Sequence, residues 1–195
     1  IVEANKVNIL FTAPTGVRML KKQDETWLTR YDTSSVKSFF LAGEPLDEPT
    51  GKWLSGHLGV PIIDHYWQTE TGWPILSHAP KFNYKDHKPG TPGYPMFGYD
   101  AKVLNEETGE PCQPGEKGLL AISAPLPPGC LTTVWKNNER FIKSYYSLFD
   151  GQQYSSSDYA VTDEEGYFYI LGRTDDVINV AGHRIGTQEI EAAIS

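Results

Sequence analysis

A strand, a helix and a second strand follow one another within about 30 residues, and this order limits the fold more than any other feature of the sequence. Val36–Ala42 is an apolar run rich in β-forming residues, Glu48–Leu58 has a helical pattern, and Val60–His65 is the next predicted strand. Such a unit is normally a right-handed crossover between parallel strands of a sheet covered by helices. We therefore predict an α/β sheet in which Ala42 and His65 end neighbouring strands at one edge.

The second half of the chain has a different pattern, with Pro and Gly frequent after residue 75 and only short strand signals. Ala101–Asn105 and Lys117–Ser123 predict one antiparallel pair. Tyr159–Thr162 and Tyr167–Leu171, joined by the turn at Asp163–Gly166, predict another. The predicted fold class is therefore α/β, with part of a parallel sheet followed by a small antiparallel, barrel-like β subdomain.

Charge and hydropathy exclude several classes of function. The 195 residues carry 17 Lys and Arg against 25 Asp and Glu, a net charge of −8, without the basic face that a nucleic-acid binder needs. Apolar runs such as Val7–Phe11 are far shorter than the roughly 18 residues of a membrane span. Cys112 and Cys130 lack the spacing of a zinc site or a disulfide framework. We expect no nucleic-acid or membrane partner and a reducing compartment: the cytoplasm, or the mitochondrial matrix in a eukaryote.

Polar residues follow both predicted strand ends, where open α/β sheets bind ligands. Gly43-Glu44-Pro45 comes after the first strand and, taken alone, is more simply an ordinary strand-to-helix turn. Tyr66–Trp73 comes after the second and combines aromatics with hydroxyls, an amide and a carboxylate. The alternative is a loop packed on the core whose Thr and Gln satisfy local backbone groups. Hydroxyls that donate to phosphate and a Glu oxygen suited to Mg²⁺ instead favour a nucleotide site.

A third feature pairs an acid with an arginine. Asp158 ends the polar run Tyr154–Asp158, and Arg173 follows fifteen residues later. A carboxylate can accept from both hydroxyls of a ribose, and an Arg can hold ribose or phosphate oxygens beside it. The simpler interpretations are a turn residue and a surface ion pair. We expect the predicted hairpin between the two residues to bring them close together.

These segments occur in the order found in AMP-forming acyl-CoA synthetases, which this chain resembles over almost its whole length. The shared motifs are Gly43-Glu44-Pro45, Tyr66–Gly72, Asp158 and Gly172–Arg184. The amino-acid sequences of three further segments resemble the propionyl-CoA synthetase branch, which lies beside acetyl-CoA synthetase: Glu107–Cys112, Pro125–Cys130 and Tyr145–Phe149. The resemblance implies activation of a carboxylate by ATP to an acyl-adenylate with loss of pyrophosphate, followed by transfer of the acyl group to coenzyme A.

The same resemblance implies a role for each motif residue. Thr69 and Glu70 are the expected catalytic residues, with Thr69 at the α-phosphate and Glu70 at the Mg²⁺ that accompanies ATP. The remaining expected nucleotide contacts are Gly43, Glu44 and Pro45 on the adenine side, Tyr66, Trp67 and Gln68 on the opposite wall, and Asp158 with Arg173 at the ribose. Catalysis would come mainly from positioning and charge neutralisation.

The expected acyl pocket is small. In similar short-chain enzymes an indole at the position of Trp67 caps the pocket, and Ala42 stands where acetate-specific relatives carry a larger aliphatic residue. One extra methylene gives only about 1–3 kcal/mol of discrimination. We therefore expect propionate as the acid, with acetate tolerated. The alternatives are an acetate–CoA ligase of the same mechanism and a nucleotide-binding piece without turnover.

The C-terminal segment resembles the start of a second domain. Asp175 matches the hinge of the family, Gly182 and Arg184 match residues that approach coenzyme A, and His183 is expected to be structural. Ser157 stands where many relatives have Gly, and a slight backbone shift is expected there. Asn179 replaces a Lys common in the wider superfamily, as in the short-chain branch.

The predicted domains follow from this resemblance. They are the rear part of the AMP-binding α/β subdomain at 1–98, the antiparallel β subdomain at 99–174, and the hinge with a truncated C-terminal domain at 175–195. The chain begins without Met and ends within an apparent helix, Gln188–Ser195, so we expect a piece of a longer protein. Because the family's phosphate loop and C-terminal catalytic Lys have no counterpart here, the piece alone should not catalyse. The sequence predicts no oligomeric state.

Overall fold

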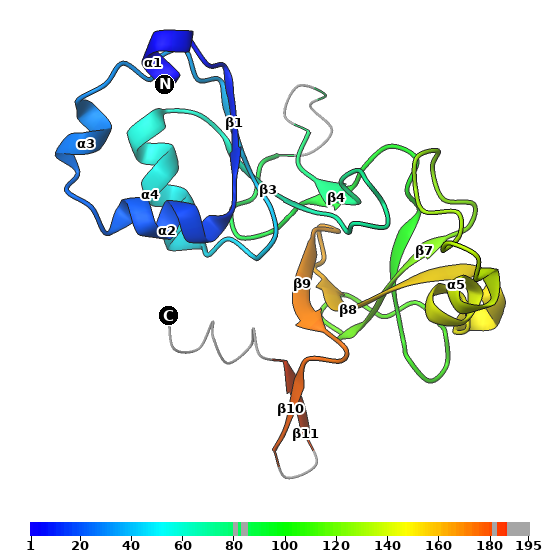
Figure 1. Ribbon diagram of the computed structural model, residues 1–195. Coiled ribbons are helices and arrows are strands. Elements are labelled where there is room, and N and C mark those ends of the chain that lie inside the picture. The colour runs from blue at the N-terminus through cyan, green and yellow to red at the C-terminus, as the bar shows by residue number, and fades with distance from the viewer. Residues whose placement is uncertain (80–81, 83–85, 181–182, 187–195) are drawn as a thin grey trace. The chain divides into compact units, whose positions relative to one another are not determined.

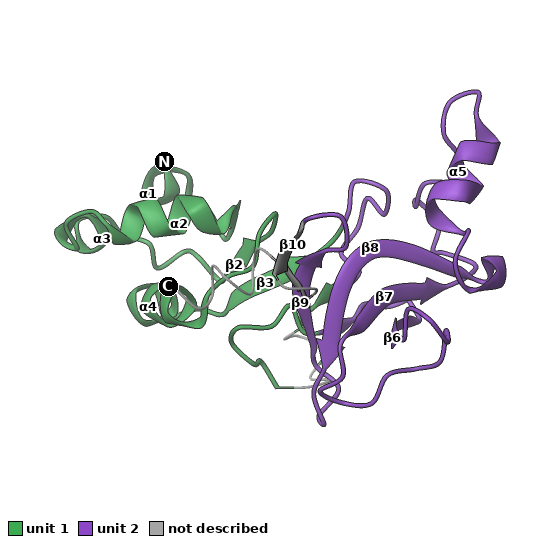
Figure 2. Cartoon of the chain, turned by 90° about the horizontal axis from the view of Figure 1, so that it is seen from below, with its two compact units in different colours: residues 1–67, 76–93 green, residues 68–75, 94–195 purple. Residues whose placement is uncertain are grey.

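The computed structural model describes residues 1–79, 82, 86–180 and 183–186, with the backbone alone for 177–180 and 183–186. Two compact units divide the chain (Figure 2): unit 1 comprises Ile1–Trp67 and Leu76–Gly93, and unit 2 comprises Gln68–Ile75 and Tyr94–Ser195. The predicted boundaries at 98/99 and 174/175 refer to domains of a longer protein and stay predictions. The predicted helix at Gln188–Ser195 lies outside the described residues.

Unit 1 contains the predicted parallel sheet. Its strands are β1 (Ile9–Thr12), β2 (Ser38–Leu41), β3 (Ile62–Tyr66) and β4 (Leu76–Ser77). β1 pairs with β2 and β2 with β3 in parallel, and β4 is antiparallel to β3. The predicted parallel crossover is confirmed, because β2 and β3 pair side by side (Figure 2), and α2 and α4 lie to the left of β1 and β3 in Figure 1.

The helices of unit 1 are α1 (Val2–Asn5), α2 (Pro14–Lys21), α3 (Thr26–Thr29) and α4 (Glu48–Leu58). α4 has the predicted bounds because both of its ends are capped locally. The side chain of Asp47 accepts from the backbone N of Thr50 at 2.8 Å, and Gly59 takes the left-handed conformation, φ 65°, while its N–H bonds to Ser55. α1 and α3 are single turns that the sequence analysis did not predict.

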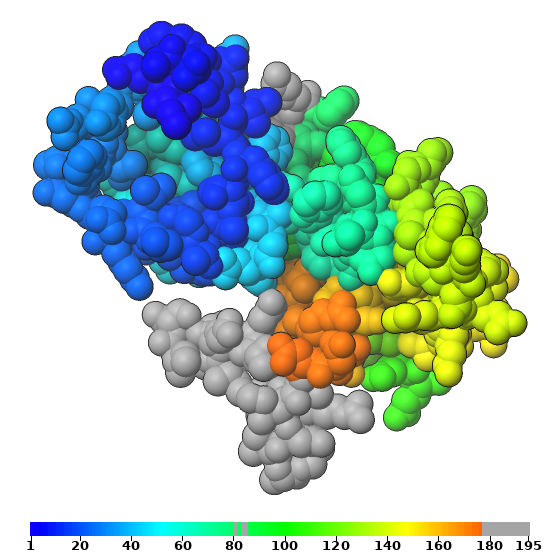
Figure 3. All heavy atoms as spheres, in the orientation of Figure 1, coloured from blue at the N-terminus to red at the C-terminus, as the bar shows by residue number. Residues whose placement is uncertain are grey.

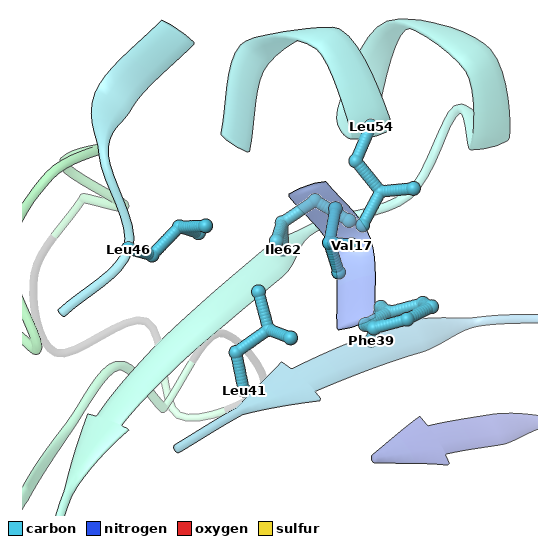
Figure 4. Packing of buried hydrophobic residues seen from close by; sticks show 6 residues of the cluster. All are labelled: Val17, Phe39, Leu41, Leu46, Leu54 and Ile62. Atoms are coloured by element: carbon cyan, nitrogen blue, oxygen red, sulfur yellow. The ribbon is translucent and has the colours of Figure 1, made fainter. Parts of the chain in front are cut away.

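Six buried side chains form the core of unit 1 (Figure 4): Val17 from α2, Leu54 from α4, Phe39 and Leu41 from β2, Ile62 from β3, and Leu46 from the β2–α4 connection. Alternate residues of a strand face opposite sides of the sheet, so this cluster joins one face of the sheet to α2 and α4. The packing fixes the carboxyl end of β2, from which residues 42–45 continue.

Unit 2 is mainly an antiparallel sheet in the order β6-β7-β8-β9, in which the two predicted pairs, β6–β7 and β8–β9, are confirmed and the pairing of β7 with β8 was not predicted. Its elements are β5 (Tyr94–Pro95), β6 (Ala101–Leu104), β7 (Gly118–Ser123), α5 (Asn138–Tyr145), the 3-10 helix η2 (Phe149–Gly151), β8 (Gln153–Thr162), β9 (Phe168–Arg173), β10 (Val177–Val180) and β11 (His183–Gly186). β10 and β11 form a separate antiparallel pair. α5, which the sequence analysis did not predict, lies at the surface within the yellow segment of Figure 3.

β8 is longer than predicted and contains Asp158, which the sequence analysis placed before the strand. The polar run Ser155–Ser157 concealed the strand. The structure buries Ser155 and Ser156, and Ser156 Oγ donates to the carbonyl of Leu120 at 2.8 Å.

Over the described residues, no helix has the length and apolar character needed to cross a membrane.

Candidate functional site

In unit 1, the segment after β2 is held by contacts from α2. Ala42 is buried and continues the pairing with β1, its N–H donating to the carbonyl of Thr12 at 3.3 Å. Gly43 has φ 101°, a conformation that disfavours any residue with a Cβ. Glu44 then accepts from the backbone N of Thr15 at 2.7 Å and also from the Thr15 hydroxyl. The predicted loop is therefore anchored to the first turn of α2.

Arg18 of α2 completes this anchor. Its guanidinium contacts Glu44 Oε2 at 2.9 Å, Asp47 Oδ2 at 3.0 Å and the carbonyl of Pro45 at 3.0 Å. Burial by itself would raise the pKa of Glu44, but the hydrogen bonds from Thr15 and Arg18 outweigh it and hold that pKa below its ordinary value. Glu44 is therefore an ionised acceptor that shapes the loop. Sequence analysis missed Arg18, whose position in a short amphipathic helix gave no sign of this role.

A buried acid lies beneath the same loop. Asp64 of β3 is 8% exposed, and its Oδ2 accepts from the backbone N of Leu46 at 3.1 Å. Burial raises its pKa to about 7, against the opposing effect of the backbone hydrogen bonds and of Arg18. The carboxyl is therefore protonated in the folded protein over a pH range in which it would ionise in an unfolded chain.

We predict that Asp64→Asn removes a pH-dependent loss of stability. Because the pKa of Asp64 is raised in the folded state, the stability that the neutral carboxyl gives the wild-type protein is fully present below about pH 4. This stability is lost as the pH rises through about 7. Above that range the variant, which is neutral and still offers an oxygen to Leu46, should be more stable by up to about 4 kcal/mol. Thermal unfolding of both full-length proteins across this range measures the difference. A gap that does not change with pH would contradict the assignment.

Trp67 follows the end of β3 and remains 41% exposed. Its ring lies 6.4 Å from that of His65, which in turn packs against Phe11 at 5.5 Å and Phe40 at 5.8 Å. Tyr66 is the last residue of β3 and is half-buried. The alternative of a loop with fully buried aromatics is therefore wrong for Trp67, whose indole projects from the strand end.

In unit 2, the segment that continues from Trp67 turns back on itself around Thr71. The Thr71 hydroxyl accepts from the backbone N of Gln68 at 3.1 Å and bonds to the carbonyl of Trp73, also at 3.1 Å. Thr71 is 1% exposed, whereas Thr69 is exposed. One of the two hydroxyls therefore satisfies local backbone groups, as the alternative interpretation expected, and Thr69 faces solvent.

Gln68 joins this segment to β8. Its Nε2 donates to Asp158 Oδ2 at 2.8 Å and to the carbonyl of Ser156 at 2.7 Å, while its Oε1 accepts from the Tyr154 hydroxyl at 2.9 Å. A carboxylate can only accept, so the amide nitrogen must face Asp158 and the amide oxygen must face Tyr154. Two of the predicted motifs, 90 positions apart, therefore meet in the fold.

Glu70 is held from α5. Its Oε1 accepts from the Tyr145 hydroxyl at 2.7 Å, and the backbone of the same residue accepts from the N–H of Leu131 at 2.6 Å. A half-buried carboxylate with one oxygen anchored supplies the hard oxygen ligand that Mg²⁺ prefers, so the residue present suits the predicted ion. Sequence analysis assigned Tyr145 and Tyr154 no role, because only the tertiary fold brings them to this loop.

Asp158 and Arg173 are directly opposed in the β8–β9 ladder, which confirms that the hairpin brings them together. The ladder is irregular here, and Ser157 takes a left-handed φ of 59°, the conformation that glycine adopts most easily. The guanidinium of Arg173 bonds to Asp175 through Nε at 3.0 Å and Nη2 at 3.2 Å. This is an exposed ion pair, the simpler of the two interpretations, and it lowers the pKa of Asp175.

The structure does not describe the side chains of the residues that were predicted to contact coenzyme A. Gly182 lies outside the described residues, and Arg184 and His183 are described only by their backbone in β11. Asn179 is likewise described only by its backbone, in β10.

Comparisons with known proteins agree on one family. Residues 1–129 match the family described as "AMP-binding enzyme". The whole chain is 54% identical to a propionate–CoA ligase of Salmonella typhimurium and 42% identical to an acetyl-coenzyme A synthetase of Pyrobaculum aerophilum, covering 31% and 29% of those proteins. Among solved structures, an anthranilate CoA ligase in complex with anthranoyl-AMP matches with a TM-score of 0.81 at 26% identity, over 98% of this chain and 34% of that one. The chain thus spans about a third of the length of these relatives.

Proposed function

This chain belongs to the family of AMP-binding enzymes, and we propose on that premise that the protein containing it joins propionate to coenzyme A. In the first step the propionate oxygen attacks the α-phosphorus of ATP and pyrophosphate leaves, which gives propionyl-AMP. In the second step the thiol sulfur attacks the acyl carbon, AMP leaves, and the thiol proton passes to solvent. AMP is the leaving group that makes an otherwise unreactive carboxylate an acyl donor.

The observation that carries this proposal is the hydrogen bond from Gln68 to Asp158. It joins the loop that bears Thr69 and Glu70 to the strand that bears the expected ribose ligand. We assign Asp158 to the ribose hydroxyls, with Arg173 beside it, because a carboxylate that only accepts hydrogen bonds suits a diol. Surface ion pairs contribute only about 0–1 kcal/mol, so replacing the exposed Arg173–Asp175 pair by a contact between Arg173 and a ligand would cost little.

The adenine contacts are assigned to the segment after β2 and to the end of β3. Since the Glu44 carboxylate is engaged by Thr15 and Arg18, we assign the contact with the base to the backbone of Gly43, Glu44 and Pro45. Tyr66, Trp67 and Gln68 supply the opposite wall. The absence of a Cβ at Gly43, together with its φ of 101°, permits close approach of a planar ring.

Thr69 and Glu70 are the residues we assign to the reacting phosphates. The exposed Thr69 hydroxyl would donate to the α-phosphate, and the anchored Glu70 carboxylate would hold the Mg²⁺ of Mg·ATP. That ion supplies neutralisation of phosphate charge when it is bound. Gly182 and Arg184 are proposed to approach coenzyme A in the second step. Because residues outside this chain complete the family's site, the chain alone is proposed to be inactive.

Propionate is proposed from the acyl-pocket residues. Trp67 projects from the end of β3, where an indole would limit the length of the acid, and Ala42 is small and buried at the end of β2. The 54% identity to a protein named propionate–CoA ligase supports the same choice, whereas the identity to the acetyl-coenzyme A synthetase of Pyrobaculum aerophilum is 42%.

The test is a comparison of acetate, propionate and butyrate as substrates of the full-length protein. We expect the highest kcat/KM with propionate and a lower but measurable kcat/KM with acetate, with a margin of roughly 10–200-fold over acetate, because one methylene gives only about 1–3 kcal/mol of discrimination. AMP should accumulate in step with the thioester. Acetate ahead by tenfold or more would make the protein an acetate–CoA ligase of the same mechanism.

A further inference from the structure

Two stacked tyrosines hold the two ends of the segment Gln68–Glu70. Tyr145 and Tyr154 lie with ring centroids 5.3 Å apart and an interplanar angle of 8°. The Tyr145 hydroxyl donates to Glu70 and the Tyr154 hydroxyl donates to Gln68. The donors lie 75 and 86 positions along the chain from their acceptors, so neither contact is a local turn bond.

Both tyrosines are fixed by the elements that carry them. Tyr154 is fully buried in β8 and paired with Ile122 of β7. Tyr145 is the last residue of α5, where the buried ring of Phe141, one turn earlier, lies 5.6 Å from it. Asn137 caps the N-terminus of α5, where its side-chain oxygen accepts from the backbone N of Arg140 at 3.0 Å. The Tyr145 hydroxyl is therefore positioned by α5 and the Tyr154 hydroxyl by β8.

The chemistry of the pair is that of two permanent donors. A phenol ionises only at a pH of about 10, so near neutral pH each tyrosine has a hydroxyl proton to donate to its partner. The acceptor atoms, Glu70 Oε1 and Gln68 Oε1, are thereby held in single orientations.

We propose that Tyr145 and Tyr154 are positioning residues for the nucleotide site, Tyr145 fixing the carboxylate of Glu70 for Mg²⁺ and Tyr154 fixing Gln68 against Asp158. This inference rests on the proposed function and extends it to α5, a helix to which the sequence analysis assigned no role in the site. It makes different demands on the two hydroxyls. Loss of the Tyr145 hydroxyl should weaken the binding of Mg²⁺, and loss of the Tyr154 hydroxyl should weaken the binding of the nucleoside.

The test measures ATP binding to the full-length protein by calorimetry at a series of Mg²⁺ concentrations, without acid, so that no turnover occurs. Tyr145→Phe removes one hydroxyl and keeps the stack, and we expect the Mg²⁺ concentration for half-maximal ATP binding to rise about tenfold, as for loss of a hydrogen bond to a charged group. Tyr154→Phe should weaken ATP binding at saturating Mg²⁺ by a similar factor.

The matched control is Tyr146→Phe. Tyr146 packs edge-on against Tyr154 at 6.0 Å, yet within the described chain its hydroxyl bonds to neither Gln68 nor Glu70. We expect this variant to stay within about twofold of wild type in both readouts, because it loses no hydrogen bond to the site. In a Glu70→Gln background, Tyr145→Phe should no longer shift the Mg²⁺ midpoint by more than about twofold, because the partner charge is gone.

The outcomes separate the two claims. If wild type binds Mg·ATP and Tyr145→Phe behaves like Tyr146→Phe, the positioning role is wrong while the proposed function stands. An unchanged effect of Tyr145→Phe in the Glu70→Gln background would also overturn it, because the effect would then not pass through Glu70. If wild type binds no ATP at any Mg²⁺ concentration, the proposed function and the inference fall together.

Discussion

Replacing Asp175 with Pro should separate the two half-reactions of the full-length protein. Asp175 lies between the β8–β9 hairpin and β10, and the last backbone bond before it runs from Thr174 N to the carbonyl of Ser157 at 2.9 Å. A residue at an element boundary can absorb large torsion changes, and proline fixes φ. We expect acyl-adenylate formation to stay within a few-fold of wild type and thioester formation to fall by about a hundredfold, the cost of a misplaced reacting group.

The matched control is Asp175→Ala, which removes the same carboxylate but leaves the backbone free to rotate. Both variants lose the ion pair to Arg173, so any effect of that pair appears equally in each. The half-reactions are measured as labelled pyrophosphate exchange and as thioester release. If Asp175→Pro lowered both steps equally, or Asp175→Ala matched it, Asp175 would not be a hinge.

Replacing Trp67 with Gly should change which acids the protein accepts. The indole is 41% exposed at the end of β3 and is the only bulky group that we assign to the acyl pocket. Each methylene admitted to an apolar pocket is worth about 1–3 kcal/mol, or roughly 10–200-fold in kcat/KM. We therefore expect kcat/KM for butyrate and longer acids to rise at least about tenfold relative to propionate, while propionate itself becomes a poorer substrate.

Trp73 provides the control for this variant. It lies on the same loop and is 57% exposed, but we assign it no contact with the acid. Trp73→Gly should leave the chain-length profile unchanged. An unchanged profile in Trp67→Gly as well would show that this indole does not limit the acid.

Local signals in the sequence account for the parts of the fold that could be predicted. α4 was predicted with its correct bounds because Asp47, Pro49 and Gly59 define its ends within the chain itself. The parallel pairing of β2 with β3 follows from the crossover between them. The proximity of Asp158 and Arg173 could be predicted from the turn at Asp163–Gly166, but their direct pairing depends on a register shift between Tyr159 and Ala160 that the turn does not predict.

What could not be predicted depends on tertiary contacts. α5 is a mostly polar eight-residue helix, and its buried side chain, Phe141, stabilises it through tertiary packing that the sequence alone does not show. Arg18 reaches Glu44 across 26 positions, and Tyr145 reaches Glu70 across 75, distances over which a single sequence carries no pairing signal. β8 was shortened in the prediction because buried serines bonded to backbone look like a loop when only their polarity is known.

The most direct test of the proposed function is the exchange of labelled pyrophosphate into ATP by the full-length protein without coenzyme A. An enzyme that forms propionyl-AMP must run this reaction in reverse, so we predict exchange that requires Mg²⁺ and propionate and is abolished when propionate is omitted. Absence of propionate-dependent exchange, or thioester formation that yields ADP and phosphate, would contradict the account.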